Sequence, residues 1–487
     1  MISAQTLALA TPLAAVAAAV LVALVPQRQV ARVAIAAALP VAGSALTLAG
    51  LAFRHAAHPV FGRWIVVDAA GGLLLAVIAV VGLASMLASA SYLRGASNSF
   101  MTRIRPERGY FVVLLVFWAA LLAVPVAGNL GVAWLLIEAT TAASAILVGF
   151  SGKAQALEAG WKYLILTSLG LGVALLGIAI LTTGLPGGGI DGLAWHGLAA
   201  FGSGRQVGLT AYLLLIAGLA AKIGWAPVHN WLPDAHSQAP PPVSALLSAA
   251  LLPAVLLIAW RSERGLAPVI GSHSARLVLI GFGLASVAVA VPFLWRPMPF
   301  KRLLAYSSLE HLGVMALGLG FGTPLALAGV ALHIAGHAIA KALGFYASAP
   351  LADHEPRAAR RAVSGIGRTA PALGTAIGIS LGALSGLPPS PLFFSEVLIL
   401  AGGFAAGQIW AAAAAAVLLA LGFLGLAHAA IETLAGEVSR RDDAAPPGLR
   451  LVTALASVAV VALVGLAAAA PWLAGTGFVA ALVKGVP

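Results

Sequence analysis

Long apolar stretches separated by short polar connections make up most of this 487-residue chain. A transmembrane helix needs about 20 mostly apolar residues, and about fourteen stretches reach that length. None alternates like a barrel strand, so helices are the predicted spanning element. The expected spans are 4–25, 30–53, 65–92, 110–127, 129–150, 160–183, 207–230, 241–260, 276–295, 301–320, 324–349, 369–402, 408–431 and 449–470.

The composition agrees with an all-α integral membrane protein. Hydrophobic residues make up 61% of the chain and charged residues 9%, whereas a soluble domain carries about 25% charged residues. The absence of cysteine excludes disulfides, thiolate metal sites and cysteine-ligated iron–sulfur clusters. No basic region precedes the first apolar stretch, so we expect a retained helix there and not a cleaved signal.

The net charge of +12 follows from where the basic residues lie. With fourteen spans, 17 of the 27 Lys and Arg fall in connections on one side of the membrane, and only seven, Arg261 among them, fall on the other. The positive-inside rule places the basic connections on the cytoplasmic face of a cell inner membrane, and we expect both chain termini on the periplasmic face. This distribution explains the charge without a nucleic-acid partner.

A few ionisable residues interrupt the apolar stretches. A lysine at the bilayer centre costs about 2.5–3.5 kcal/mol to insert, so such a residue is treated first as functional. The set comprises Glu138, Lys162, Lys222, His229, Glu310, His311, His333, His337, Lys341, Glu396 and His428.

The stretch 329–345, GVALHIAGHAIAKALGF, holds the densest group of these residues. His333, His337 and Lys341 are spaced four and four, which places them on one helix face over roughly 12 Å. Two histidines four apart also match a helical metal site, but no cysteine or carboxylate stands beside them in the sequence. Proton hopping between imidazoles and a lysine fits better, and we expect neither a metal nor another cofactor.

Prolines break two of the predicted spans next to a charged residue. Pro227 and Pro233 follow Lys222, and three prolines between 388 and 391 precede Glu396. A broken helix frees backbone groups that need protein or water as partners. Paired interrupted helices in two halves of a chain are typical of inverted-repeat transporters.

Each of these residues could instead have a structural role. Glu138 would then form an interhelical hydrogen bond, and Lys222 would extend toward the membrane surface from a helix end. Lys162 would form an ion pair with Glu158 four residues earlier. Glu310 and His311 would form an interfacial pair, His229 would lie in a loop, and His428 would occupy an ordinary position in the bundle.

Four segments resemble a known family. They are KIGWAPVHNWLPDAHSQAPPPVSALL, KRLLAYSSLEHLG, LHIAGHAIAKALGFYAS and GLPPSPLFFSEVLIL, within roughly residues 110–430. They resemble hallmark segments of the antiporter-like subunits of respiratory complex I, of Mrp-type sodium/proton antiporters and of group 4 hydrogenases. NWLPDAHS, AYSSLEHLG and LEAGWKYLILTSLG resemble the F subunit of hydrogenase-4 and formate hydrogenlyase assemblies.

The resemblance implies a division of the chain into an N-terminal three-helix segment (1–109), two inverted five-helix repeats (110–262 and 263–432) and a C-terminal helix (433–487). It also implies a lateral proton pathway along the membrane midplane. The pathway residues would be Glu138, Lys222, His333, His337, Lys341 and Glu396, with Lys162, His229, Asp234, Glu310 and His311 as accessory residues.

Two positions depart from the family pattern. Ser248 stands where some members have a histidine, which thins the central relay between the halves. Pro299 replaces the usual aspartate before KRLLAYSS and affects a loop contact.

The resulting hypothesis is a non-catalytic, proton-translocating subunit of a redox-driven complex. Its partners would be other membrane subunits, lipid and a peripheral redox module of hydrogenase-like or NADH dehydrogenase-like type. Glu138 would pair with Lys222, whose proton would move laterally to the 333–341 group when the pair separates, and Glu396 would serve as exit or loading site. Competing hypotheses are an Mrp-type sodium/proton antiporter subunit, a quinone-handling redox subunit and a purely structural anchor.

Overall fold

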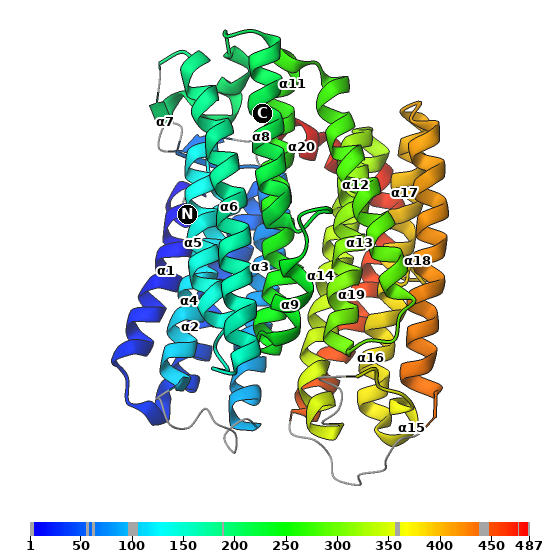
Figure 1. The fold of residues 1–487 in the computed structure, drawn as a ribbon. Coiled ribbons are helices and arrows are strands. Elements are labelled where there is room, and N and C mark those ends of the chain that lie inside the picture. The colour runs from blue at the N-terminus through cyan, green and yellow to red at the C-terminus, as the bar shows by residue number, and fades with distance from the viewer. Residues whose placement is uncertain are drawn as a thin grey trace.

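The computed structural model describes residues 4–54, 58–60, 64–95, 106–187, 189–355, 361–437, 448–475 and 477–485. These residues form an elongated bundle whose long helices run side by side (Figure 1). The sheet content of this part of the chain is one small antiparallel hairpin of β1 (His58–Val60) and β2 (Ile65–Val67). The predicted all-α class is confirmed.

Thirteen helices in the described residues are long and apolar enough to cross a membrane. A fourteenth crossing is divided between two shorter apolar helices, α16 and α17, so the predicted number of spans is confirmed. The long helices are α1 (Ala4–Leu24), α2 (Val30–Arg54), α3 (Ala69–Gly95), α4 (Pro106–Ala123), α5 (Leu130–Val148), α6 (Ala154–Gly184), α8 (Arg205–Ile223), α11 (Leu252–Ile270), α12 (Ser272–Leu294), α13 (Phe300–Phe321), α14 (Pro324–His354), α18 (Ile409–Ala435) and α19 (Leu449–Gly475).

Shorter elements connect these helices. A π-helical turn at Leu247–Leu251 joins α10 to α11, so the span runs unbroken from Pro241 to Ile270. The short elements are α7 (Gly189–Gly192), α9 (Trp231–Gln238), α10 (Pro241–Leu246), α15 (Ile366–Thr369), α16 (Pro371–Leu384), α17 (Pro391–Ala405), α20 (Gly477–Gly485) and 3-10 turns at Gln27–Gln29, Val124–Val126 and Trp195–Ala200.

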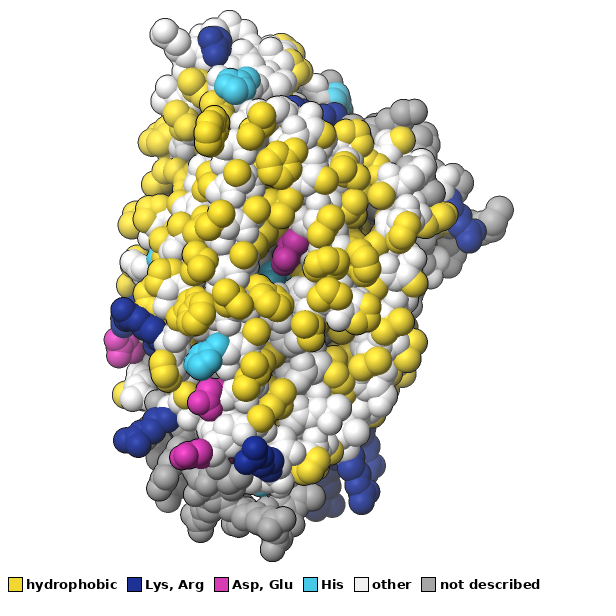
Figure 2. All heavy atoms as spheres, turned by 90° about the vertical axis from the view of Figure 1, so that its right-hand side faces the viewer, with side chains coloured by type: hydrophobic (Ala, Val, Ile, Leu, Met, Phe, Trp, Pro, Cys, Tyr) yellow, Lys and Arg dark blue, Asp and Glu magenta, His cyan; other side chains and the backbone are white. Residues whose placement is uncertain are grey.

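The interior of the bundle is formed by α13 and by the span from Pro241 to Ile270, both buried along their whole apolar length. Most of α14 is buried as well, whereas most residues of the apolar windows of α18 and α19 are exposed or only partly buried. Figure 2 shows these outer side chains as a broad hydrophobic face. Ionisable residues on α13 and α14 are therefore enclosed by protein and need partners within the bundle.

The first predicted break separates α8 from α9. α8 ends at Ile223, and Gly224 then adopts a positive φ of 83° that a residue with a Cβ disfavours. The Trp231 indole donates to the freed Ala221 carbonyl at 2.7 Å. The Ala226 amide donates to Ser286 Oγ of α12 at 3.0 Å. The polar stretch after the prolines forms the short helix α9 and is not a plain loop.

The second predicted break separates α16 from α17 in a similar way. α16 ends at Leu384, and Gly386 has a φ of +74°. Ser390 Oγ donates to the Ala383 carbonyl at 3.1 Å and caps α17 by accepting from the Leu392 amide. Both interrupted helices are confirmed. In both, a glycine of positive φ follows the helix end and a polar side chain donates to a carbonyl freed there.

The prediction that Arg261 lies in an outer connection is wrong. α11 continues to Ile270, and Arg261 is fully buried within it. Its guanidinium donates to Asp68 Oδ2 at 2.7 Å, and the Asp68 side chain is buried too. The predicted span ended before Arg261 because a charged residue interrupts the apolar stretch. In the structure the Asp68 carboxylate neutralises the Arg261 charge inside the bundle.

The ends of the described chain lie toward one end of the bundle. The start of α1 and the whole of α20 lie in the upper half of Figure 1. The α1–α2 connection and α15 lie at the lower end. In Figure 2, Lys and Arg side chains lie toward both ends of the molecule, with more of them toward that lower end. Several arginines of the predicted basic connections fall within 101–105, 356–360 and 438–447, outside the described residues.

Candidate functional site

Lys222 lies in the last turn of α8, immediately before the first break, and is fully buried. Its Nζ donates to Thr141 Oγ1 at 2.7 Å and to the Tyr163 hydroxyl at 2.6 Å. Thr141 directs its own hydroxyl hydrogen to the Ile137 carbonyl, and Ser144 of α5 accepts from Tyr163. The pocket therefore turns oxygen lone pairs toward the lysine.

Glu138 lies on the same helix as Thr141 but does not form an ion pair with Lys222. Its Oε1 accepts from Ser168 Oγ at 2.6 Å, and its Oε2 is buried without a hydrogen-bond partner among the described residues. Glu138 and Lys222 interact electrostatically, but their hydrogen bonds in the described structure go to other groups. The direct pair expected from the sequence is absent, because hydroxyl groups of α5 and α6 bind both charged ends.

Lys341 occupies a comparable position in the second half of the chain. It is fully buried on α14, and its Nζ donates to the Leu304 carbonyl at 2.6 Å and to Ser307 Oγ, both of α13. Ser307 in turn donates to the Leu304 carbonyl. Both buried lysines are thus held by a hydroxyl from a neighbouring helix, and neither makes direct contact with a carboxylate.

Three histidines of α13 and α14 form one buried cluster. His311 Nδ1 and His333 Nε2 lie 3.1 Å apart. The His337 ring lies 5.3 Å from the His311 ring, and neither His337 nitrogen has a hydrogen-bond partner in the described structure. The ladder of His333, His337 and Lys341 was expected from the helical spacing, and α13 adds His311 to it.

The hydrogen bonds of Ser395 fix the protonation of His333. Ser395 Oγ donates to the Leu392 carbonyl at 2.7 Å and lies 2.8 Å from His333 Nδ1. Because the hydroxyl hydrogen is already used, His333 Nδ1 carries a hydrogen and donates to Ser395. His333 Nε2 then has a free lone pair, which accepts from His311 Nδ1 in a neutral pair.

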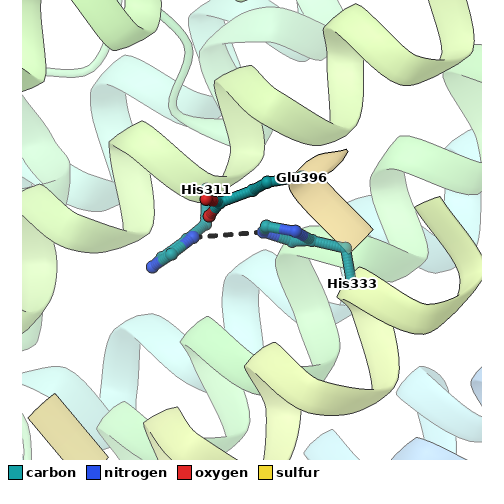
Figure 3. Close-up of side chains that lie close together, drawn as sticks. All are labelled: His311, His333 and Glu396. Atoms are coloured by element: carbon teal, nitrogen blue, oxygen red, sulfur yellow. Dashed lines mark hydrogen bonds between the residues drawn. The ribbon is translucent and has the colours of Figure 1, made fainter. Parts of the chain in front are cut away.

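Two carboxyl groups lie beside this histidine cluster. One carboxylate oxygen of Glu396 lies within 4.8 Å of a ring nitrogen of His311 and of His333 (Figure 3). Glu310 is almost fully buried, and its Oε2 has no hydrogen-bond partner in the described chain. Glu310 interacts electrostatically with both Glu396 and Lys341.

The space between the two halves holds hydroxyl groups. Ser248, in the π-helical turn, lies 2.8 Å from Ser308 of α13. Ser308 Oγ also donates to the Leu304 carbonyl, which accepts from Lys341. Ser248 therefore belongs to the hydrogen-bonded surroundings of Lys341.

His236 is a buried residue that the sequence analysis did not single out. It lies on α9, stacks on Phe345 of α14 at 5.4 Å and lies 6.5 Å from the Trp231 ring. Both its ring nitrogens are buried without a partner in the described residues. It interacts electrostatically with Lys341 and His337, so it connects the first break to the second half. In the sequence, the position of His236 shortly after Pro233 in the broken span could have marked it as a candidate.

The remaining accessory residues lie nearer the surface. Lys162 is half-exposed and binds Glu158 Oε1 at 2.6 Å, which is the i,i+4 ion pair considered as its structural alternative. Asp234 of α9 lies 3.6 Å from Lys162 and 3.2 Å from Arg302. These side chains line a cavity of about 230 Å³. In the described structure, no hydrogen bond or ion pair links Lys162 or Asp234 to the buried lysines.

Two histidines stand apart from these clusters. His229 lies in the first break, is half-buried, and its Nδ1 has no partner among the described groups. His428 of α18 stacks on Trp295 with ring centroids 6.2 Å apart. His428 is exposed on α18, so the structure does not place it in the packed position within the bundle that was expected for it.

Comparisons with known proteins agree with this arrangement. Residues 127–422 match the family described as NADH:quinone oxidoreductase/Mrp antiporter, TM, which covers more than half of the chain. The chain belongs to this family. The match includes both breaks, both buried lysines and the histidine cluster, so the resemblance noted in the sequence is confirmed.

Individual relatives extend the likeness. A hydrogenase-4 component F homolog from Methylacidiphilum infernorum is 34% identical over 61% of this chain and 63% of its own length, just under two thirds. NADH-quinone oxidoreductase subunit N from Desulforudis audaxviator is 28% identical over 80% of this chain and 77% of its own length. A chain of the archaeal membrane-bound sulfane sulfur reductase has the same fold, with a TM-score of 0.83, 22% identity and coverage of 99% and 97% of the two chains.

Proposed function

We propose that this chain is a proton-translocating membrane subunit of a redox-driven complex of hydrogenase-4 or complex I type. The observation that carries the proposal is the pair of fully buried lysines, Lys222 and Lys341, each held by hydroxyl groups beside an interrupted helix. A lysine that loses or gains a countercharge releases or takes up a proton. Family membership and the names of the relatives support the same function.

The proton pathway would run laterally through both halves. Glu138 and Lys222 interact electrostatically but are hydrogen-bonded to other groups, which would correspond to the separated state of the proposed pair. A proton leaving Lys222 would pass through the surroundings of His236 and Ser248 to Lys341. His337, His333 and His311 would carry it on toward Glu396.

The proposed domain division follows from the same scheme. Residues 110–262 would form the first inverted five-helix repeat, which contains the α8–α9 break. Residues 263–432 would form the second, which contains the α16–α17 break. The segments 1–109 and 433–487 would flank them, and the non-catalytic chain would receive its energy from a peripheral redox module.

A lateral partner subunit is part of the proposal. Figure 2 shows an acidic side chain beside a histidine in the middle of the hydrophobic face on the side of α17 and α18. A carboxyl group facing lipid at that depth is costly. Another membrane subunit on this face would cover it and continue the pathway.

The test of proton pumping replaces the two proposed pathway residues of the first half of the chain. Lys222→Ala and Glu138→Gln should abolish proton pumping by the assembled complex while subunit assembly stays intact. Lys153→Ala, which removes an exposed lysine, should pump normally. Proton uptake into inverted vesicles measures all three variants, and normal pumping by both pathway variants would contradict the proposal.

The same vesicles distinguish protons from sodium. A proton-translocating subunit should give the same rate of pH-gradient formation with and without Na⁺. A pH gradient that decays only when Na⁺ is added would instead identify an Mrp-type antiporter subunit.

The proposed orientation places the lower end of Figure 1 in the cytoplasm and both termini on the periplasmic side. Because the natural chain contains no cysteine, single cysteines can report it directly. Ala154→Cys at the start of α6 should react with an impermeant maleimide only in inverted vesicles. Ser203→Cys, beyond the other end of α6, should react only in right-side-out vesicles, and the reverse pattern would overturn the orientation.

A further inference from the structure

The histidine cluster and Glu396 come from three different helices and converge on one point. His311 lies on α13, His333 on α14 and Glu396 on α17, just after the second break. One ligand atom from each lies within 4.8 Å of the other two (Figure 3). The sequence pairs His333 with His337 and offers no adjacent carboxylate, so this combination exists only in the folded chain.

We propose that His311, His333 and Glu396 form a binding site for Zn²⁺. Two imidazole nitrogens and one carboxylate oxygen are a common ligand set for zinc with an open fourth position. Zn–N bonds of about 2.0–2.1 Å in tetrahedral geometry place two ligand nitrogens about 3.3 Å apart. His311 Nδ1 and His333 Nε2 lie 3.1 Å apart, so the spacing fits, although both rings must turn from their mutual hydrogen bond toward the ion.

The groups behind the ligands suit metal binding. A zinc-bound histidine usually donates its second ring N–H to a carbonyl or an oxygen-bearing side chain, which orients the ring. Ser395 Oγ accepts from His333 Nδ1 at 2.8 Å and leaves Nε2 free for the metal. His311 Nδ1 can bind the metal when the ring hydrogen lies on Nε2, which has no hydrogen-bond partner among the described residues.

The charge of the ion can be balanced locally. Glu396 supplies one negative charge as a ligand, and Glu310 interacts electrostatically with it from α13. Glu310 Oε2 is buried and has no hydrogen-bond partner in the described chain. Two carboxylates beside two neutral imidazoles would compensate a divalent cation in an otherwise apolar bundle. Nitrogen ligands favour zinc over Mg²⁺ and Ca²⁺.

The three proposed ligands differ in their exposure. The side chain of Glu396 is partly exposed, whereas both histidines are buried behind it. The fourth position would be open to water or to His337, whose two ring nitrogens lack hydrogen-bond partners among the described residues. The site itself does not depend on transport. Its consequence, a block of proton transfer through the same imidazoles, rests on the proposed function.

Direct binding to the purified full-length chain tests the site. Co²⁺ is the probe, because its visible absorption reports tetrahedral nitrogen and oxygen coordination and Zn²⁺ displaces it. The wild-type chain should bind one Co²⁺, and His333→Ala and Glu396→Gln should lose the absorption. His428→Ala, which removes a histidine outside the cluster, is the matched control and should bind normally.

A second variant leaves all three ligands in place. Ser395→Ala removes the acceptor of His333 Nδ1–H and should weaken Co²⁺ binding about 10–100-fold. Absence of the absorption from the wild-type chain, or equal binding by His333→Ala, would overturn the site. These outcomes do not depend on whether the chain pumps protons.

The transport consequence has its own measurement. Zn²⁺ should inhibit proton pumping by the assembled complex over the concentration range in which it displaces Co²⁺ from the purified chain. Zinc binding without inhibition would contradict the expected block of proton transfer but would not contradict the metal site. Failure of the Lys222 and Glu138 variants to impair pumping would overturn the proposed function alone.

Discussion

At the residue scale, the buried lysines are distinguished by what binds them. Lys222 and Lys341 each contact hydroxyl oxygens whose hydrogens are directed elsewhere, mostly to helix carbonyls. A site lined by lone pairs can bind an ammonium group without a fixed carboxylate partner. Such a lysine responds to a distant charge more readily than one locked in a short ion pair, which suits a transfer site.

Thr141 offers a direct test of this arrangement. Thr141→Val removes the hydroxyl that accepts from Lys222 with little change of shape, which costs about 1.5–3 kcal/mol for a hydrogen bond to a charged group. We expect pumping to fall about tenfold or more. Thr140→Val is the control, because Thr140 donates only to the Ile137 carbonyl. Equal pumping rates for the two variants would argue against a role for the Thr141 contact.

His236 is predicted to be the link between the halves. Its unpartnered ring nitrogens lie between the first break and the surroundings of Lys341. His236→Gln keeps a polar side chain but cannot relay a proton, so pumping should fall about 100-fold or more if the transfer depends on it. Redox activity of the complex should persist. Pumping by His236→Gln at the rate of His428→Gln would show that the protons take another route.

At the element scale, the two interrupted helices position the chemistry. α8 ends immediately after Lys222, and Glu396 lies in the second turn of α17. Each interruption removes backbone hydrogen bonds that tryptophan, serine and amide groups replace. The proline pattern predicted both interruptions, but not the short helix α9 that carries His236 and Asp234 toward different partners.

Gly386 tests the link between backbone and carboxyl group in the second break. A Cβ at this position would lie 3.0 Å from Glu396 Oε2, and φ is +74°. Gly386→Ala should destabilise the chain by about 1–2 kcal/mol and also displace Glu396, lowering the pumping rate. Gly407 has a φ of +73° with open space around it, so Gly407→Ala should destabilise comparably yet pump normally. Thermal unfolding and vesicle assays separate the two effects.

At the scale of the whole molecule, a buried ion pair ties distant parts of the bundle together. Asp68, just before α3, binds Arg261 of α11 at 2.7 Å and also accepts from the Gly71 amide. Both charged side chains are fully enclosed. The pair connects the first three helices to the span that forms the interior of the bundle.

Breaking this pair should destabilise the whole chain and not only the pathway. Arg261→Met leaves the Asp68 carboxylate buried without its partner, which costs about 3–5 kcal/mol. We expect a lower unfolding temperature in detergent. The double variant Asp68→Asn with Arg261→Met should recover part of the loss, because no unpaired charge remains. A single variant as stable as the wild type would contradict the assignment of a structural role to the pair.

The sequence by itself determined the class of the protein, the number of crossings, the two breaks and the identity of most buried ionisable residues. These properties follow from apolar length, proline and charge, which act locally along the chain. Only the tertiary structure decided which groups meet: hydroxyls with Lys222, His311 and Glu396 with His333, His236 with the second half, and Asp68 with Arg261. Such contacts join residues far apart in the chain, and helix packing sets them, so no local pattern reveals the partner of a buried charge.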